Sequence, residues 1–232
     1  MSLSSLGEPD KDSSVWIAEV SHELRLPIAN LKLLVETLLD GAADDPETLR
    51  KMLTRAQQEV ERLNKLVVNL LSVEQVSQGR QEVPRQWNLL AERASYTLES
   101  TRAMALARNV TIELDIEKDW QIYANQQQLD QVLLNLVENA IKFTPTGGKV
   151  WIRSGNTPGC FHITDTAIGM AMHEIPKIFQ RFYRIDRAQS RGSTGLGLSI
   201  VKHITELHGA KINVASQEGI GSTFSFEFPG PP

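Results

Sequence analysis

Two stretches of the chain carry side chains suited to phosphate chemistry. In the first, the acid Glu23 directly follows His22. In the second, Asn139 stands four residues after Asn135, and Lys142 lies nearly one helical turn further on. Neutral imidazole is a nucleophile near neutral pH because its unperturbed pKa is about 6.5. Magnesium prefers hard oxygen ligands, and amide oxygens beside substrate phosphates suit it. The two stretches therefore predict a phosphoacceptor histidine and a separate magnesium and phosphate site.

Glycine-rich stretches follow the asparagine pair. Residues 192–198 read Gly-Ser-Thr-Gly-Leu-Gly-Leu and open a predicted helix. Glycine lets backbone amides approach phosphates at the positive end of a helix. Such a turn alone is weak evidence. Here it comes after the asparagine pair and after Asp165, which ends a predicted strand, and a further glycine stretch follows at residues 219–224. This order favours a nucleotide site.

Two helices joined by a short loop are expected to carry His22. Apolar residues recur at three-and-four spacing over residues 15–39 and again over 49–70, and residues 41–46 between them have turn chemistry. The spacing resembles a coiled-coil seam. Its members are Ile17, Val20, Leu24, Ile28, Leu31, Val35, Leu38, Leu49, Leu53, Ala56, Val60, Leu63, Val67 and Leu70. A lone hairpin leaves too much apolar surface uncovered, so we expect a homodimeric four-helix bundle. The alternative is a monomeric hairpin packed on the second domain.

The seam also predicts the orientation of the histidine. His22 falls between the seam positions Val20 and Leu24, so we expect it to face away from the core, where it stays accessible. Pro27 lies inside the same helix, where proline removes one backbone hydrogen bond and forces a kink. The sequence therefore predicts a locally specified geometry just after the histidine.

The second region has a different pattern. We expect helices at residues 89–106, 126–143 and 197–207, and strands at residues 110–116, 121–124, 149–154, 161–165, 211–215 and 223–228. Helices interleaved with mostly antiparallel strands predict a two-layer α/β sandwich, and hence an α+β chain overall. The predicted organisation is a flexible leader at 1–14, a helical hairpin at 15–78, a linker at 79–85 and the sandwich domain at 86–230.

The composition of the chain indicates which classes of partner are not expected. The net charge is −4 and the pI is near 5.8, so neither nucleic acid nor an anionic membrane is expected as a partner. The single cysteine, Cys160, excludes an intramolecular disulfide and fits a reducing compartment. No apolar run approaches the roughly 18 residues that span a bilayer. We therefore expect a cytoplasmic location, with membrane attachment only through upstream segments that this chain lacks.

Taken in order, these motifs resemble the catalytic core of bacterial two-component sensor histidine kinases, loosely those of the phosphate-sensing type. That core joins a HisKA-type dimerisation and phosphoacceptor domain to a GHKL-type ATP-binding domain, and the resemblance covers nearly the whole chain from about Val15. It implies ATP and Mg2+ as cofactors and autophosphorylation of His22, with Glu23 accepting the proton. The phosphoryl group would then pass to an aspartate in the receiver domain of a response regulator.

The resemblance also implies roles for the remaining site residues. Asn135 and Asn139 would hold Mg2+, Lys142 would meet phosphate, Asp165 would accept a hydrogen bond from the adenine amino group, and Arg184 would be the arginine of the lid. The implied ATP-binding set is Asn135, Asn139, Lys142, Phe143, Asp165, Gly169, Arg184, Gly195, Leu196, Gly197 and Thr223, with Asn139 and Asn135 as the metal ligands. Thr223 would support the adenine pocket.

Phe143 and the basic residues near Arg184 each have two possible interpretations, and the remaining histidines have one. Phe143 either packs on the purine or belongs to the core. The basic residues around Arg184 either neutralise phosphate charge or form a solvated helical face; they are Lys177, Arg181, Arg187 and Arg191. The other histidines show no metal-ligand spacing and are interpreted as structural; they are His162, His173, His203 and His208.

Three positions depart from the family pattern. Leu26 stands four residues after the histidine, where the family usually has Thr or Asn to orient water during dephosphorylation of the partner, so weak phosphatase activity is expected. Ala167 replaces the first glycine after Asp165. If φ is positive there, alanine costs about 1 kcal/mol; otherwise its methyl group could block the nucleotide. Ser193 replaces another common glycine.

Two other functions are considered beside the kinase. One is a dimeric signalling scaffold whose ATP binding is weakened by Ala167. The other is an ATPase of the wider superfamily, such as a chaperone or mismatch-repair type. Those proteins carry a glutamate as hydrolytic base where this chain has Asn135, and they lack the histidine hairpin.

Overall fold

The computed structural model describes residues 11–77, 84–185 and 195–231, without the side chains of some residues in the first two helices. The chain divides into two units, Met1–Glu74 and Gln75–Pro232, each of which is described by itself. The predicted linker at 79–85 falls largely outside the described residues. The predicted domain bounds therefore stay predictions.

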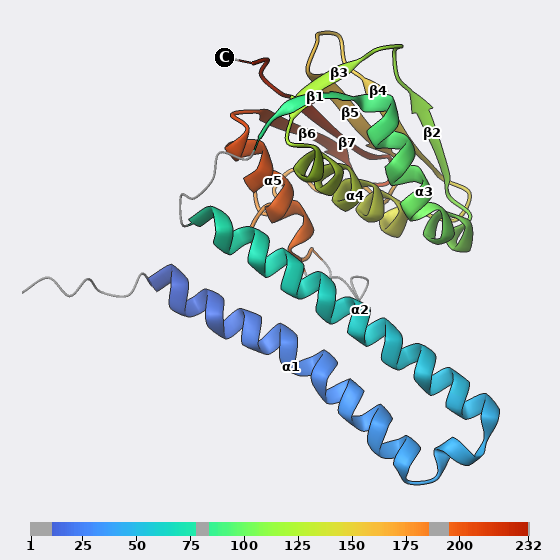
Figure 1. Ribbon diagram of the computed structural model, residues 1–232. Helices are drawn as coiled ribbons and strands as arrows, with labels where there is room; N and C mark the ends of the chain where they lie inside the picture. Colours follow the sequence, from blue (N-terminus) through green and yellow to red (C-terminus); the bar gives the residue numbers. More distant parts are fainter. Residues whose placement is uncertain (1–10, 78–83, 186–194, 232) are drawn as a thin grey trace, which may run out of the picture. The chain divides into compact units, whose positions relative to one another are not determined.

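The first unit is a helical hairpin (Figure 1). Helix α1 (Lys11–Leu39) and helix α2 (Pro46–Ser77) are joined through a short 3-10 helix, Ala42–Asp44. The start of α2 is well specified, because the Asp45 carboxylate accepts a hydrogen bond from the Thr48 amide at 3.0 Å and Pro46 occupies the first helical position. Helix α1 continues through Pro27 as one helix.

Burial along the hairpin splits the apolar seam into two sets. The first set is half-buried and consists of Leu24, Leu31, Leu38, Leu49, Ala56 and Leu63. The second set alternates with it and is about half exposed: Ile28 (55 %), Val35 (52 %), Leu53 (54 %) and Val60 (46 %). Among the described side chains, the hairpin therefore covers one seam position in each heptad and leaves the other open; the seam positions Ile17, Val20, Val67 and Leu70 lie outside these described side chains.

The second unit begins at a short strand that the sequence pattern missed. Its elements are β1 (Gln86–Leu89), α3 (Leu90–Arg108), β2 (Thr111–Asp115), β3 (Gln121–Ala124), α4 (Gln126–Phe143), β4 (Lys149–Ser154), β5 (Cys160–Asp165), α5 (Gly197–Leu207), β6 (Lys211–Gln217) and β7 (Gly221–Glu227). Strand β1 pairs antiparallel with β3 in a separate two-stranded sheet. The three predicted helices and six predicted strands are present, with ends that shift by a few residues at most.

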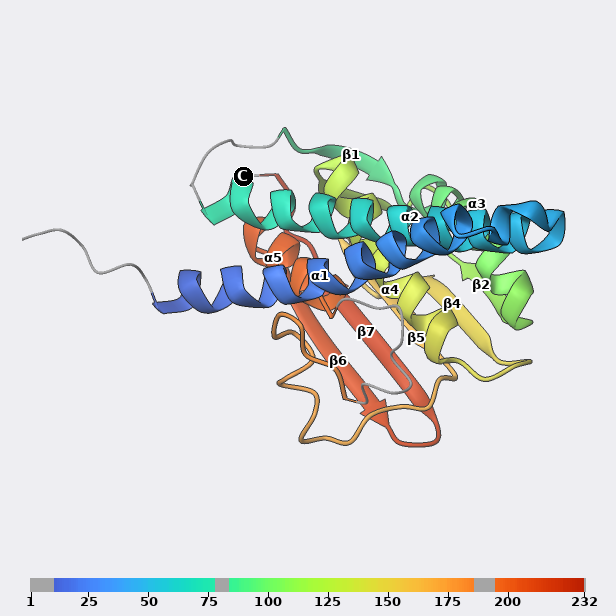
Figure 2. The ribbon, with the colours of Figure 1, turned by 90° about the horizontal axis from the view of Figure 1, so that it is seen from below.

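The main sheet has five strands in the order β2-β4-β5-β7-β6. Strands β2 and β4 are parallel and the other neighbours are antiparallel. Helices α3, α4 and α5 lie on one face of this sheet, which Figure 2 shows from below. The buried strand residues face these helices: Val150, Ile152, Phe161, Ile163, Phe224 and Phe226. The prediction of a two-layer α/β sandwich after a helical hairpin is confirmed.

Close contacts tie the chain entering the second unit to the ends of two helices. The Arg85 guanidinium donates to the carbonyl oxygens of Leu207 at 2.7 Å and His208 at 3.3 Å, where α5 ends. The Asn125 side chain, which caps the start of α4, donates to the Pro84 carbonyl at 3.1 Å. The Asn125 amide donates to His208 Nε2 at 3.1 Å. One junction thus connects the entering chain, α4 and α5.

Candidate functional site

Helix α4 presents its polar candidates beside an apolar face. The helix begins at the Asn125 cap, whose side-chain oxygen accepts from the Gln128 amide at 3.1 Å. Its buried residues are Leu129, Val132, Leu133, Leu136, Val137, Ala140 and Ile141. Asn135 and Asn139 are half-buried and four residues apart, so their side chains project from the same side of the helix. The helix thereby brings two amide groups to one side, and their role as metal ligands stays a prediction.

Lys142 and Phe143 occupy the last turn of α4. The Lys142 ammonium lies 5.1 Å from the centre of the Phe143 ring, an arrangement that attracts a cation to the face of the ring. Phe143 is half-buried, so its ring is not enclosed in the core. Whether the ring packs on a purine stays a prediction.

Asn135 has a buried donor that the protein leaves unused. Within the described part of the chain, Asn135 Nδ2 is buried and has no hydrogen-bond partner. An unpaired buried polar group costs about 1–3 kcal/mol. The neighbouring helix is close, because a Cβ atom added to Gly197 would lie 3.4 Å from Asn135 Oδ1. The amide thus lies beside the start of α5 with hydrogen-bonding capacity for a ligand.

Asp165 is fixed at the end of β5. It is 7 % exposed, and its Oδ1 accepts from the amides of Ala167 at 3.0 Å and Ser222 at 2.9 Å. Burial raises the pKa of the Asp165 carboxyl, whereas the two backbone hydrogen bonds act in the opposite direction. The two amides fix the direction in which the carboxylate points.

The loop after Asp165 is held against the turn between β6 and β7. Gly169 has φ +66°, and a Cβ atom there would lie only 1.9 Å from the Gln217 carbonyl oxygen. The Gly219 amide donates to the Ile168 carbonyl at 2.7 Å. Glycine is therefore required at 169 by close approach of the protein backbone.

Ala167 fits the backbone without strain. The described non-glycine residues with positive φ are Asn109, Asp119 and Phe182, so Ala167 is not in the left-handed region. The residue is 6 % exposed. The backbone cost considered for alanine does not apply, and only the methyl group itself distinguishes this position from glycine.

Two glycines and a buried leucine form the entry to α5. Gly195 has φ +70°, and a Cβ atom there would lie 2.7 Å from the carbonyl carbon of Phe182. The Phe182 amide donates to the Gly195 carbonyl at 2.9 Å. Leu196 is 1 % exposed and therefore belongs to the core, and Gly197 begins the helix. The Leu196 side chain is therefore not available to a ligand.

The basic run falls on turns. Over residues 171–184 the chain forms a series of turns and no α-helix, so the described part of the run does not form a helical face. Arg184 is half-buried and Arg181 is exposed. Arg187, Arg191 and the departure at Ser193 lie outside the described residues.

Thr223 is placed apart from Asp165, which corrects one prediction. In the β5–β7 ladder, Asp165 is opposite Ser222 and Thr164 is opposite Thr223. Successive side chains of a strand point to opposite faces, and the Thr164 and Thr223 hydroxyls lie 3.1 Å apart. Thr223 therefore faces away from the helices. Ser222 is the β7 residue beside Asp165, and strand alternation counted back from buried Phe224 could have identified it.

His22 and Glu23 lie within α1, but their side chains are outside the described part of the structure. The outward orientation of His22 therefore stays a prediction. Nearby, Leu26 is 56 % exposed and Pro27 is buried.

The remaining histidines have protein partners or partly buried positions. His162 Nδ1 is 2.9 Å from the Ser225 hydroxyl, and His173 pairs with Glu174 at 2.8 Å. Burial lowers the pKa of both His203 and His208. Across residues 11–77, 84–185 and 195–231, no three His, Cys, Asp or Glu side chains are grouped closely enough to hold a metal ion.

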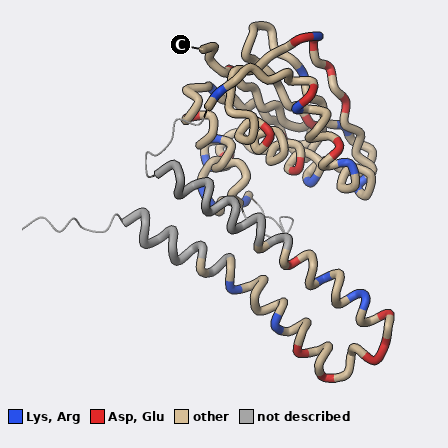
Figure 3. Tube along the Cα trace, in the orientation of Figure 1, with Lys and Arg blue, Asp and Glu red and all other residues tan. Residues whose placement is uncertain are grey.

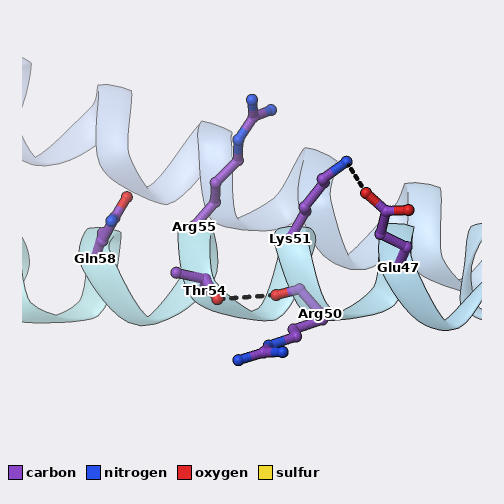
Figure 4. Close-up of a pocket in the computed structure, with 6 residues that line it drawn as sticks. All are labelled: Glu47, Arg50, Lys51, Thr54, Arg55 and Gln58. Atoms are coloured by element: carbon purple, nitrogen blue, oxygen red, sulfur yellow. Dashed lines mark hydrogen bonds and ion pairs between the residues drawn. The ribbon is translucent and has the colours of Figure 1, made fainter.

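A surface pocket lies on α2 in the first unit, and none of its lining residues is a predicted site residue (Figure 4). Its lining residues are Glu47, Arg50, Lys51, Thr54, Arg55 and Gln58. Lys51 pairs with Glu47 at 2.6 Å, and the basic residues Arg50, Lys51 and Arg55 follow one another on this helix between Glu47 and Glu59 (Figure 3). All six lining residues are exposed.

Two family models match the chain in the order of its two units. The "His Kinase A (phospho-acceptor) domain" matches residues 13–79, and the "Histidine kinase-, DNA gyrase B-, and HSP90-like ATPase" matches residues 124–232. With both domains in this order, the chain belongs to the two-component sensor histidine kinases and represents their catalytic core. The ATPase domain implies that the chain binds ATP.

The chain is also similar to curated sensor proteins. Sensor protein SrrB of Staphylococcus aureus is 34 % identical over 228 residues, which are 96 % of this chain and 39 % of the relative. The chain thus spans about two fifths of the length of these curated relatives. In the described residues, no helix combines the length and apolar character needed to cross a membrane.

Solved histidine kinases share the fold. Acinetobacter baumannii AdeS has a TM-score of 0.72 at 24 % identity, covering 89 % of this chain and 96 % of AdeS, and so shows the fold alone. Histidine kinase ThkA, solved in complex with the response regulator TrrA, has a TM-score of 0.67 at 28 % identity over 92 % of this chain and 60 % of ThkA. ShkA, solved with AMPPNP, has a TM-score of 0.68 at 26 % identity over 92 % of this chain and 45 % of ShkA.

Proposed function

We propose that this chain transfers the γ-phosphoryl group of ATP to His22 and then to an aspartate of a response regulator. The observation that carries the proposal is Asn135 Nδ2, which is buried and unpaired within the described residues and belongs to an amide beside the glycine that opens α5. The second unit also holds Asp165 in a fixed orientation. The binding of AMPPNP by ShkA and of a response regulator by ThkA supports the same assignment.

The residues present fit ATP and Mg2+. Asp165 would accept from the adenine amino group, and the backbone around Gly195 and Gly197 would lie along the phosphates at the positive end of α5. The amide oxygens of Asn139 and Asn135 would hold the metal ion. When bound, the ion neutralises charge on the phosphate oxygens.

The transfer itself asks mainly for alignment and charge neutralisation. One ring nitrogen of His22 attacks the γ-phosphorus, an N–P bond forms, the P–O bond to the β-phosphate breaks, and ADP leaves. Glu23 takes the proton from the other ring nitrogen, which raises the nucleophilicity of the imidazole as attack proceeds. Lys142 and Arg184 balance the negative charge of the phosphates.

A homodimer through the hairpin is part of the proposal. One apolar position in each heptad is covered within the hairpin, and the alternate position is about half exposed. A second hairpin would cover this second row and complete a four-helix bundle. The exposed Leu26, which cannot hydrogen-bond water, supports the further proposal that phosphatase activity is weak.

Incubation of the purified chain with Mg-ATP tests the function directly. We expect an acid-labile phosphate label that His22→Ala abolishes and that His173→Ala, a change at an exposed histidine of the second unit, leaves in place. Nucleotide binding without any label would favour the scaffold function. Absent binding would point to the Ala167 methyl group, and Ala167→Gly is the variant expected to restore it.

A further inference from the structure

We propose that Glu174 is a positioning residue for the ATP site, acting through Tyr183 on the backbone contact between Phe182 and Gly195. The inference rests on the proposed function, because it assigns the start of α5 to the nucleotide. It concerns a carboxylate that belongs to neither the phosphoacceptor pair nor the ATP-binding residues named above.

Glu174 collects three side-chain donors. Its carboxylate accepts a hydrogen bond from the Tyr183 hydroxyl and pairs with His173 at 2.8 Å and with Lys177 at 3.4 Å. The Glu174 side chain is only 13 % exposed, whereas those of His173 and Lys177 are 73 % and 43 % exposed. Glu174 is therefore the least exposed of these three residues. Its hydrogen bond to Tyr183 connects it to the end of the turn-forming segment 171–184.

The backbone around Glu174 is organised by the same residue. Its carbonyl accepts from the amides of Lys177 at 2.8 Å and Ile178 at 3.2 Å, and Ile178 is 5 % exposed. Because the segment has no helix or strand ladder to hold it, these contacts at Glu174 replace regular secondary structure. The side chain of Tyr183 is thereby anchored to a fixed point.

Tyr183 follows a residue in an unfavourable conformation. Phe182 has φ +61°, a left-handed conformation that costs free energy for a residue with a Cβ atom and persists only when its surroundings hold it. Its amide donates to the Gly195 carbonyl at 2.9 Å, and only Leu196 separates Gly195 from the start of α5 at Gly197. Anchoring Tyr183 constrains the residues on both sides of it, Phe182 and Arg184.

A carboxylate suits this position better than a neutral acceptor. It has two oxygens and about four acceptor sites, enough for a hydroxyl, an ammonium and an imidazole together. The Tyr183 hydrogen bond lowers the pKa of Glu174, and the Glu174 carboxylate raises the pKa of Tyr183. The donor stays protonated and the acceptor stays charged, so the pair persists through the neutral range.

Titration of the full chain with Mg-AMPPNP tests the inference, alongside amide hydrogen exchange at Phe182. Glu174→Ala and Tyr183→Phe should each weaken AMPPNP binding by about tenfold, the effect of one hydrogen bond to a charged group, and speed exchange at Phe182. Combining them should weaken binding no further than Glu174→Ala alone, because both variants lack the same Tyr183–Glu174 hydrogen bond. Glu174→Gln should lose less, since its amide oxygen still accepts from Tyr183.

Glu113→Ala is the matched control. Glu113 also accepts from a lysine, Lys149 at 2.8 Å, and from an aromatic donor, Trp151 at 2.7 Å, but it lies on β2 at the edge of the sheet. Its loss should leave AMPPNP affinity unchanged.

Three results would overturn the inference. They are unchanged affinity in Glu174→Ala with only a lower melting temperature, effects of the two single changes that add in the double variant, and unchanged exchange at Phe182. Wild-type chain that binds AMPPNP but does not label His22 would instead contradict the kinase proposal alone. Wild-type chain that binds no nucleotide would contradict both.

Discussion

Asp165 has one oxygen committed to the protein and one without a described protein partner. Its Oδ1 accepts from two backbone amides, and no other hydrogen bond of the carboxylate occurs within the described residues. This geometry explains how a nearly buried acid can recognise a donor on a ligand: the protein supplies the orientation, and the second oxygen supplies the acceptor. Thr223, on the other face of the sheet, has no part in this arrangement.

Replacement of these two residues should separate their roles. Asp165→Asn should weaken ATP binding at least tenfold, because a hydrogen bond to a charged group is worth about 1.5–3 kcal/mol. Thr223→Val should change affinity by less than about twofold, since it removes only the Thr164 contact. Calorimetric titration with Mg-ATP measures both. Equal losses in the two variants would contradict the assignment.

Leu26 offers a second test at the level of one residue. Because Leu26 is 56 % exposed, threonine can replace it without repacking. Leu26→Thr should raise the rate of response-regulator dephosphorylation by at least a few-fold, since a hydroxyl can orient water, and leave His22 labelling unchanged. Leu33→Thr, at another exposed position of α1, is the control. Equally rapid dephosphorylation by the wild-type chain would exclude the proposed weak phosphatase.

At the scale of elements, α4 begins at a hydrogen-bond arrangement that needs a neutral histidine. His208 Nδ1 lies 2.8 Å from the Ile204 carbonyl, which only accepts, so Nδ1 carries the proton. Nε2 then accepts from the Asn125 amide at the start of α4. Protonation would turn Nε2 into a donor facing a donor. The neighbouring Arg85 charge and the edge-on Phe228 ring offer no compensation.

This arrangement predicts a loss of stability in mild acid. Burial lowers the pKa of His208 in the folded chain, whereas in the unfolded chain it stays near 6.5. The unfolded state therefore binds more protons as the pH falls below about 6.5, and the free energy of unfolding decreases with it. Above that pH the contribution is fully present.

Urea unfolding between about pH 7.5 and pH 5.5 measures this effect. His208→Gln should be less stable at neutral pH and should lose part of the pH dependence. His203 is the necessary comparison, because burial lowers its pKa as well, and His203→Gln should retain the part that belongs to His208. An unchanged slope in His208→Gln would contradict the argument.

The sequence predicted elements that are specified locally. Helix α4 has a capping asparagine and a regular apolar face, and β4 and β5 alternate buried residues with less buried ones, so each was predictable from its own residues. Strand β1 was missed because its burial does not alternate, with Gln86 and Trp87 both exposed, whereas its equally short partner β3 alternates between buried and more exposed residues.

The residues of the proposed site could likewise be predicted only in part. Motif order predicted Asn135, Asp165 and Gly197, which the fold brings into one unit. The placement of Ser222, and not Thr223, beside Asp165 depends on the pairing register of β5 and β7. The hydrogen bond between Glu174 and Tyr183 depends on turns, which have no periodic sequence pattern. Neither register nor turn geometry is encoded in the spacing of a few residues.

At the scale of the whole molecule, the half-exposed seam of the hairpin predicts association. The chain should sediment at twice its mass of 25.9 kDa. A charge at an exposed seam position, Val35→Glu or Leu53→Glu, should shift it to the monomer, because it would place unpaired charges inside the bundle. Thr54→Glu adds the same charge beside the surface pocket and should leave the dimer intact. A monomeric wild-type chain would favour the hairpin packed on its own second domain.

The junction at Pro84 and Arg85 has a mechanical consequence. The chain that arrives from the hairpin is bonded to the beginning of α4 and the end of α5, and not to the central strands of the sheet. Those two helices carry Asn135 and Gly197 further along their lengths. A change in the direction of the connecting chain would therefore act first on the two helices that border the proposed nucleotide site.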